Sequence, residues 1–174
     1  DLNWKKLLRL VDRELSALPV WRTLRRSGLE PSFDEAKVLK RMAEIWEIKL
    51  IHLQRLLFQT LEAFDSAGFD PILLKGAATA LTVQGNLSRR PMLDVDLLLP
   101  EKEAEAAWSL ARELEWHWDS MRFPRDAYGD AHHLPPLHDD FESGVGLEIH
   151  TTISMPDHPF GLAAAGIRSR GVEI

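Results

Sequence analysis

The segment 93–99, Leu-Asp-Val-Asp-Leu-Leu-Leu, constrains the fold of this chain more than any other feature. Its apolar residues predict a buried β-strand. Because side chains alternate along a strand, Asp94 and Asp96 share one face, while Val95 and Leu97 enter the core. Two carboxylates held this close repel each other, and a divalent cation such as Mg²⁺ or Mn²⁺ relieves that repulsion. The segment therefore predicts a metal site at Asp94 and Asp96, with a solvent-facing strand edge as the alternative.

Residues 1–67 predict an N-terminal helical region that packs on the core. Apolar residues recur at helical spacing from Leu7 onward, and Pro19 is expected to end this first helix. A second, long amphipathic helix is expected to begin at Ser32, which together with Glu35 forms a capping-box pattern. Gly68 is expected to stop it.

Residues 68–155 change to a pattern of short apolar runs separated by helices and polar loops. Strands are expected at 71–74, 93–99, 116–123, 132–137 and 147–153, and helices at 77–84 and 101–115. This order predicts an α+β fold with a small mixed sheet and an N-terminal helical lead-in. Residues 156–174 are expected to form a C-terminal tail, interpreted as truncated.

The end of the first strand has the composition of a phosphate-binding turn. Lys75 and Gly76 follow an apolar run and precede Ala77 at the start of a helix, where backbone N–H groups can meet a phosphate. Arg89 and Arg90, just before the aspartates, could clamp phosphate through bidentate hydrogen bonds. A tight turn and an ordinary charged loop are the respective alternatives.

A third acid and several histidines lie further along the chain. Glu148 and His150 alternate with apolar residues and so share a strand face, where Glu148 could complete a three-acid cluster or act as a base. His132 and His133 are adjacent and should point to opposite faces of a regular strand, which argues against a zinc site. We expect His133 to line the substrate pocket.

The composition excludes several classes of protein. The chain of 174 residues has no cysteine, so disulfides, thiolate catalysis and Cys-bound zinc are excluded. No segment is apolar enough to predict a membrane span or a secretory signal, which favours a cytoplasmic protein. The net charge of −6 disfavours a nucleic-acid partner without excluding one.

Taken in order, these motifs resemble the DNA polymerase β-type nucleotidyltransferases, and more narrowly the bacterial "uncharacterised nucleotidyltransferase" family. The resemblance covers roughly residues 45–152 and is carried by the segments 73–78, 90–98 and 147–150. It implies a minimal nucleotidyltransferase fold, with a small mixed sheet and helices on one side. It also implies that Asp94 and Asp96 bind Mg²⁺ and the triphosphate, that Glu148 is the third carboxylate, and that Gly76 lies near the phosphates.

The expected function is Mg²⁺-dependent transfer of an NMP from NTP to a hydroxyl group of a small molecule, RNA or protein. On this hypothesis Lys75, Gly76, Ala77 and Arg90 contact the nucleotide, and Arg89, His133 and His150 contact substrate. Three alternatives stay open: a non-catalytic nucleotide-binding or interaction module, a toxin-type enzyme that modifies tRNA, and a His-rich metal hydrolase.

Overall fold

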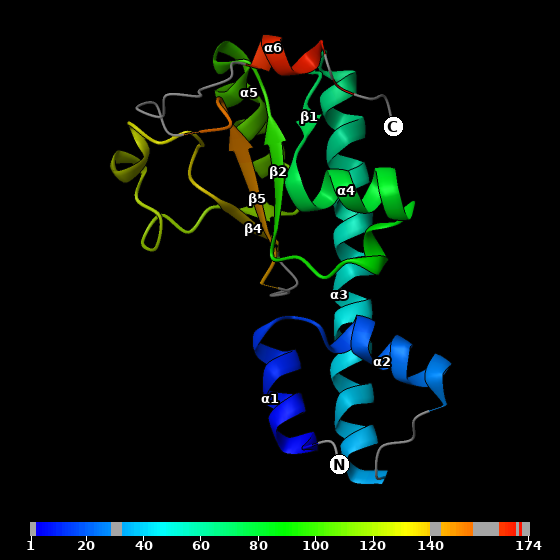
Figure 1. Ribbon diagram of the computed structural model, residues 1–174. Coiled ribbons are helices and arrows are strands. Elements are labelled where there is room, and N and C mark those ends of the chain that lie inside the picture. Colours follow the sequence, from blue (N-terminus) through cyan, green and yellow to red (C-terminus); the bar gives the residue numbers. More distant parts are fainter. Residues whose placement is uncertain (1–2, 29–32, 140–143, 155–163, 170, 172–174) are drawn as a thin grey trace.

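The computed structural model describes residues 3–28, 33–139, 144–154, 164–169 and 171 (Figure 1). Within them the chain is a mixed α+β structure with a five-stranded mixed open sheet, which confirms the predicted fold class. The helices and strands, in chain order, are α1 Trp4–Arg13, α2 Ala17–Ser27, α3 Phe33–Ser66, β1 Ile72–Leu73, α4 Lys75–Gln84, η1 Leu87–Arg89, β2 Asp94–Leu98, α5 Glu101–Arg112, β3 Trp116–His117, η2 Arg125–Tyr128, β4 Leu137–Asp139, β5 Gly146–His150 and α6 Ala164–Arg168.

The first helix ends earlier than the sequence predicts. The side chain of Asn3 caps α1 by accepting a hydrogen bond from the Lys6 N–H at 3.0 Å, and α1 ends at Arg13. Pro19 does not end a helix but lies in the first turn of α2, where a missing N–H costs nothing because the first N–H groups of a helix have no partner within it. The expected capping box at Ser32 lies outside the described residues.

Helix α3 connects the N-terminal helices to the sheet. It packs against α1 and α2 near its start and against η1 and α5 further on. Gly68, with φ of +80°, follows its C-terminus in the left-handed conformation that glycine adopts most readily. One continuous core cluster extends from Val11 in α1 to Ile149 in β5. The proposed division of the chain at residues 67 and 155 stays a prediction.

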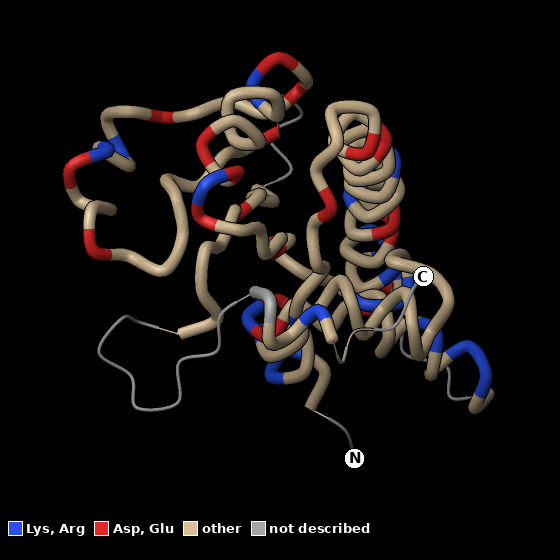
Figure 2. Tube along the Cα trace, turned by 90° about the horizontal axis from the view of Figure 1, so that it is seen from above, with Lys and Arg blue, Asp and Glu red and all other residues tan. Residues whose placement is uncertain are grey.

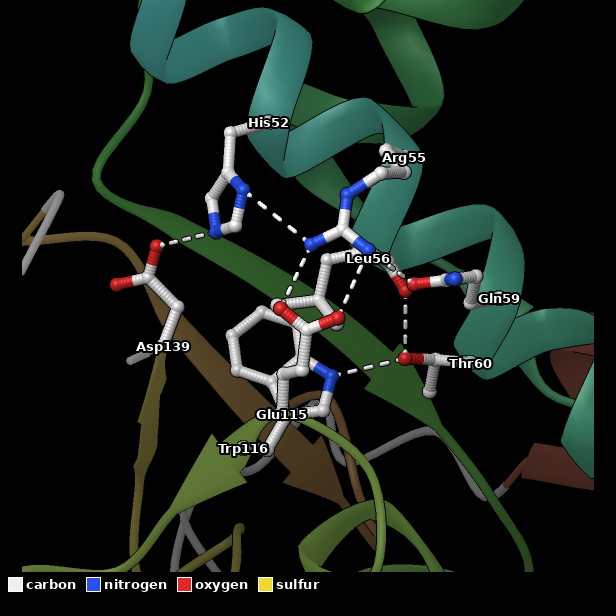
Figure 3. Close-up of polar contacts among 8 residues, drawn as sticks. All are labelled: His52, Arg55, Leu56, Gln59, Thr60, Glu115, Trp116 and Asp139. Carbon is white, nitrogen blue, oxygen red and sulfur yellow. Dashed lines mark hydrogen bonds and ion pairs between the residues drawn. The ribbon is translucent and has the colours of Figure 1, made fainter. Parts of the chain in front are cut away.

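A buried hydrogen bond joins α3 to the edge of the sheet (Figure 3). The indole Nε1–H of Trp116 donates to Thr60 Oγ1 at 2.8 Å, and Thr60 Oγ1 donates in turn to the Leu56 carbonyl at 2.8 Å. Neither Thr60 nor Trp116 is exposed to solvent. Trp116 therefore fills the core while its one polar atom is satisfied.

Two further polar contacts of α3 flank this bond (Figure 3). Arg55 binds both carboxylate oxygens of Glu115 at 2.7 Å, a bidentate geometry that adds directional specificity. His52 Nε2 lies 3.1 Å from Asp139 Oδ2 in β4. His52 is thus a structural histidine that helps to fix β4 against α3.

The sheet has the strand order β1-β2-β5-β4-β3. Strands β2 and β5 run parallel, and the other pairs are antiparallel. Figure 1 shows α5 behind these strands, and the face that carries Val95, Leu97, Leu147 and Ile149 packs into the buried core. The opposite face carries the acidic residues.

Several boundaries of strands and helices differ from the sequence prediction. Strand β3 has two residues instead of eight. Strand β4 begins at Leu137, where the predicted strand ends, because Pro135 and Pro136 lack the N–H groups that a strand ladder needs. Helix α4 begins at Lys75, two residues earlier than expected.

Candidate metal and nucleotide site

The parallel register of β2 and β5 brings the three predicted acids together. Asp96 lies directly opposite Glu148, and Asp94 lies opposite Gly146 at the start of the same pair. Neighbouring strands are about 4.8 Å apart, so carboxylates at paired positions on one face can reach a common ligand. Asp94 is exposed, Glu148 is half-buried and Asp96 is buried.

Asp96 is the most contacted of these acids. Its Oδ1 accepts hydrogen bonds from Lys75 Nζ at 2.5 Å and from His150 Nε2 at 2.8 Å. The same His150 nitrogen lies 3.3 Å from Glu148 Oε2. His150 therefore bridges the two strands from a fully buried position, with only 1% of its side chain exposed.

These contacts set the protonation of the site. Burial alone would raise the pKa of Asp96, but hydrogen bonds from His150 and Lys75 outweigh it and hold that pKa below its ordinary value. His150 holds the pKa of Glu148 below its ordinary value despite burial. Burial opposes the charged form of His150, yet hydrogen bonds to Asp96 and Glu148 raise its pKa.

Asp94 differs from Asp96 and Glu148 because its pKa is raised and theirs are lowered. Although the residue is exposed overall, partial desolvation of its carboxylate is the first cause that raises its pKa, the negative charges of Asp96 and Glu148 raise it further, and Lys75 opposes them more weakly. The cluster thus holds more negative charge than its own cations balance. That is the condition under which a bound divalent cation is most favourable.

The donor set fits such a cation. One ligand atom each from Asp96, Glu148 and His150 lies within 4.8 Å of the others. Asp94 adds a carboxylate from the same strand face, two residues before Asp96. Carboxylate oxygens are the ligands that Mg²⁺ and Mn²⁺ prefer, and His150 supplies a hydrogen-bonded support for Asp96.

The predicted phosphate-binding turn lies at the start of α4, beside β2. Leu74 N–H donates to the Asp96 carbonyl at 2.9 Å, which fixes the turn beside the acids. The residue in the left-handed region is Lys75, with φ of +46°, and not Gly76. A Cβ on Gly76 would meet Arg90 at 3.5 Å, an ordinary contact. Gly76 is therefore not required at this position by a positive φ.

The remaining nucleotide candidates differ in their contacts. Arg90 Nη1 donates to the Gly76 carbonyl at 3.3 Å, so this guanidinium lies beside the turn. Ala77 is buried in the first turn of α4, where it can offer only its backbone N–H. Arg89 is exposed at the end of η1, and within the described residues its side chain makes no hydrogen bond or ion pair with the acids.

The histidines contradict the expectation of opposite faces. The rings of His132 and His133 lie 4.8 Å apart, and both lie within 5.2 Å of the His150 ring. The chain bends at residues 131–132, and only His133 forms a bridge, to His150. The strict alternation of a regular strand therefore does not apply. Both rings lie beside His150, and the role of His133 in the substrate pocket stays a prediction.

Tyr128 also lies beside the site, although its sequence pattern did not predict this. The Tyr128 ring lies 5.4 Å from His133. Burial and the charge of Glu148 raise the Tyr128 pKa. It belongs to η2, which follows a stretch without periodicity, so its sequence carries no signal for this position.

Comparison with known protein families identifies the family of this chain. The model of a family described as uncharacterised nucleotidyltransferases matches residues 1–173. The chain belongs to this family. No curated protein and no solved structure gives a significant match. Membership supports nucleotidyl transfer as the general activity and NTP as a substrate.

Two surface properties bear on partners of this nucleotidyltransferase family member. Among the described residues, none of the helices combines the length and apolar character needed to cross a bilayer. Figure 2 shows acidic and basic positions interspersed along α3 rather than separated into two tracts. The cytoplasmic location stays a prediction.

Proposed function

We propose that this protein transfers an NMP from NTP to a hydroxyl acceptor with the help of Mg²⁺ or Mn²⁺. The observation that carries the proposal is the pairing of Asp96 with Glu148 across two parallel strands, with Asp94 on the same face. Family membership supports the reaction class. All three acids are present, which favours a catalytic protein over a binding module that only retains the fold.

On this proposal Asp94, Asp96 and Glu148 hold the metal. When bound, the cation would neutralise triphosphate charge and stabilise the developing charge on the α-phosphoryl group. His150 orients Asp96 through the hydrogen bond at 2.8 Å. Buried and bonded in this way, the Asp96 carboxylate loses little conformational freedom when it binds a ligand.

The nucleotide phosphates would lie at the N-terminus of α4. The first N–H groups of a helix have no partner within it, and they attract anions. In α4 these belong to Lys75, Gly76 and Ala77, and the Arg90 guanidinium lies 3.3 Å from the Gly76 carbonyl. These groups would bind the β- and γ-phosphates, which leave as pyrophosphate.

The acceptor would approach from the side of Glu148, His132 and His133. Its hydroxyl oxygen attacks the α-phosphorus, the bond to the β-phosphate oxygen breaks, and pyrophosphate leaves. Glu148 is ionised at neutral pH because its pKa is held down by His150, so it can accept the hydroxyl proton or remain a metal ligand. The acidic net charge favours a small acceptor over RNA.

The experiment is a calorimetric titration of NTP into the protein with and without Mn²⁺. Asp94→Asn and Asp96→Asn remove one charge each while conserving volume. We expect metal-dependent NTP binding in the wild type and its loss in both variants. Equal metal-dependent affinity in all three proteins would rule out the assigned metal site.

A further inference from the structure

Lys75 already supplies a cation to the acidic cluster. Its ammonium lies 2.5 Å from Oδ1 of Asp96, one of the three carboxylates that the proposed function gives to the metal. Its charge also interacts with Asp94 and Glu148. Among the described residues, no other lysine or arginine forms an ion pair with these three acids.

The position of Lys75 combines a fixed backbone with a movable side chain. Its φ of +46° places a non-glycine residue in the left-handed region at the start of α4, a conformation that persists only where the surroundings hold it. The side chain is 57% exposed, and its four-carbon stem is flexible. The ammonium can therefore leave Asp96 while its Cα stays beside the phosphate-binding turn.

We propose that Lys75 is a built-in counter-ion of Asp96. The metal displaces its ammonium from Asp96, and the NTP phosphates then bind the displaced ammonium. Metal and NTP therefore bind cooperatively. This inference rests on the proposed function, because it assumes the same metal and phosphate sites. An ammonium and a divalent cation repel each other strongly at ligand distance and cannot share one carboxylate oxygen. A metal that binds Asp96 through Oδ1 therefore breaks the pair between Lys75 and Asp96.

NTP makes metal binding more favourable because its phosphates offer the displaced Lys75 ammonium a new partner. Lysine binds phosphate well as a point charge, and the α4 N-terminus places Lys75 next to the expected phosphates. The coupling is reciprocal by thermodynamic necessity: whatever factor NTP adds to metal affinity, metal adds to NTP affinity. Without NTP, the site should bind metal weakly.

The test uses Lys75→Met, which keeps the length of the side chain and removes its charge. Binding of Mn²⁺ alone is followed by the loss of the free Mn²⁺ signal in electron paramagnetic resonance. Binding of ATP, GTP, CTP and UTP is then measured by calorimetry at saturating Mn²⁺. Lys102→Met is the matched control, since Lys102 is exposed on α5 and pairs only with Glu103 among the described residues.

We expect Lys75→Met to bind Mn²⁺ alone about tenfold more tightly than wild type, and to bind NTP with Mn²⁺ about tenfold more weakly, each corresponding to about 1.4 kcal/mol. Lys75→Arg keeps the charge and should leave the affinity for Mn²⁺ alone nearly unchanged. Opposite changes for two ligands cannot come from partial unfolding, which weakens both. Should Lys75→Met not fold, Lys75→Gln provides the same neutralisation.

Two results would overturn the inference, and they are distinguishable. If the wild type binds NTP with Mn²⁺ but Lys75→Met binds Mn²⁺ alone no more tightly, Lys75 is not a displaced counter-ion, and the proposed function survives. If the wild type binds neither Mn²⁺ nor NTP with Mn²⁺, the proposed function fails and the coupling fails with it.

Discussion

The two aspartates of β2 should affect the stability of the metal-free protein in opposite directions. Asp94 is exposed, and the charges of Asp96 and Glu148 help to raise its pKa, so its ionised form opposes folding. Asp96 is 1% exposed, and it pairs with Lys75 and accepts a hydrogen bond from His150. Asp94→Asn should therefore stabilise the fold, and Asp96→Asn should destabilise it, although both should abolish metal binding.

The magnitudes follow from burial. Solvent screens Asp94, so its removal gains at most about 1 kcal/mol, the upper range for exposed charges. Removing one partner of a buried ion pair costs about 3–5 kcal/mol. The lower end, about 3 kcal/mol, applies to Asp96→Asn because Lys75 is 57% exposed and can rehydrate. For a chain of this size, 1 kcal/mol shifts Tm by roughly 2–4 °C.

Differential scanning calorimetry in excess EDTA at pH 7.5 measures both shifts. We expect Tm to rise by roughly 1–4 °C in Asp94→Asn and to fall by roughly 6–12 °C in Asp96→Asn. The rise should shrink in 1 M salt, where the screening length falls to about 3 Å. Destabilisation by Asp94→Asn, or equal shifts in both variants, would refute this reading of the cluster.

Three further predictions use other residues. Glu148→Gln should change NTP affinity by only a few-fold but cut turnover by roughly 10²–10⁴, the usual contribution of a positioned base; a fully active variant in single-turnover assays would contradict it. Thr60→Val should cost about 1–3 kcal/mol in urea unfolding because it leaves the buried Trp116 N–H without a partner, whereas Thr60→Ser, which keeps the hydroxyl, should cost about 1 kcal/mol. The pKa of His150 is raised in the folded protein, so protonated His150 stabilises the fold. This contribution is complete below about pH 6.5, the pKa of histidine in the unfolded chain, and is lost as pH rises through the higher folded pKa. Over that pH range the Tm of the wild type should therefore fall, and the Tm of His150→Gln should fall less.

The sequence was most informative where one physical rule governed the whole segment. Alternation along β2 correctly placed Val95 and Leu97 in the core, with the aspartates on the other face. The pairing of Asp96 with Glu148 needed the further assumption that β2 and β5 are neighbours. That assumption came from the family resemblance and not from periodicity.

The sequence failed where a local conformation departs from the common rule. Positive φ is adopted far more readily by glycine than by lysine, so nothing in the sequence indicates that Lys75 takes this conformation, which it does next to its ion pair with Asp96. His132 and His133 were assigned opposite faces of a regular strand, but the chain bends there. Long-range ion pairs and bends of this kind leave no periodic signal.

The most direct test of nucleotidyl transfer is to follow the position of the label. The protein is incubated with Mn²⁺, a pool of small hydroxyl compounds, and NTP labelled at either the α- or the γ-phosphate. We predict an acceptor that carries the α-label and no γ-label, with release of pyrophosphate, and none of this product with Asp94→Asn or Asp96→Asn. Transfer of the γ-label, or the same α-labelled product from the variants, would contradict the account.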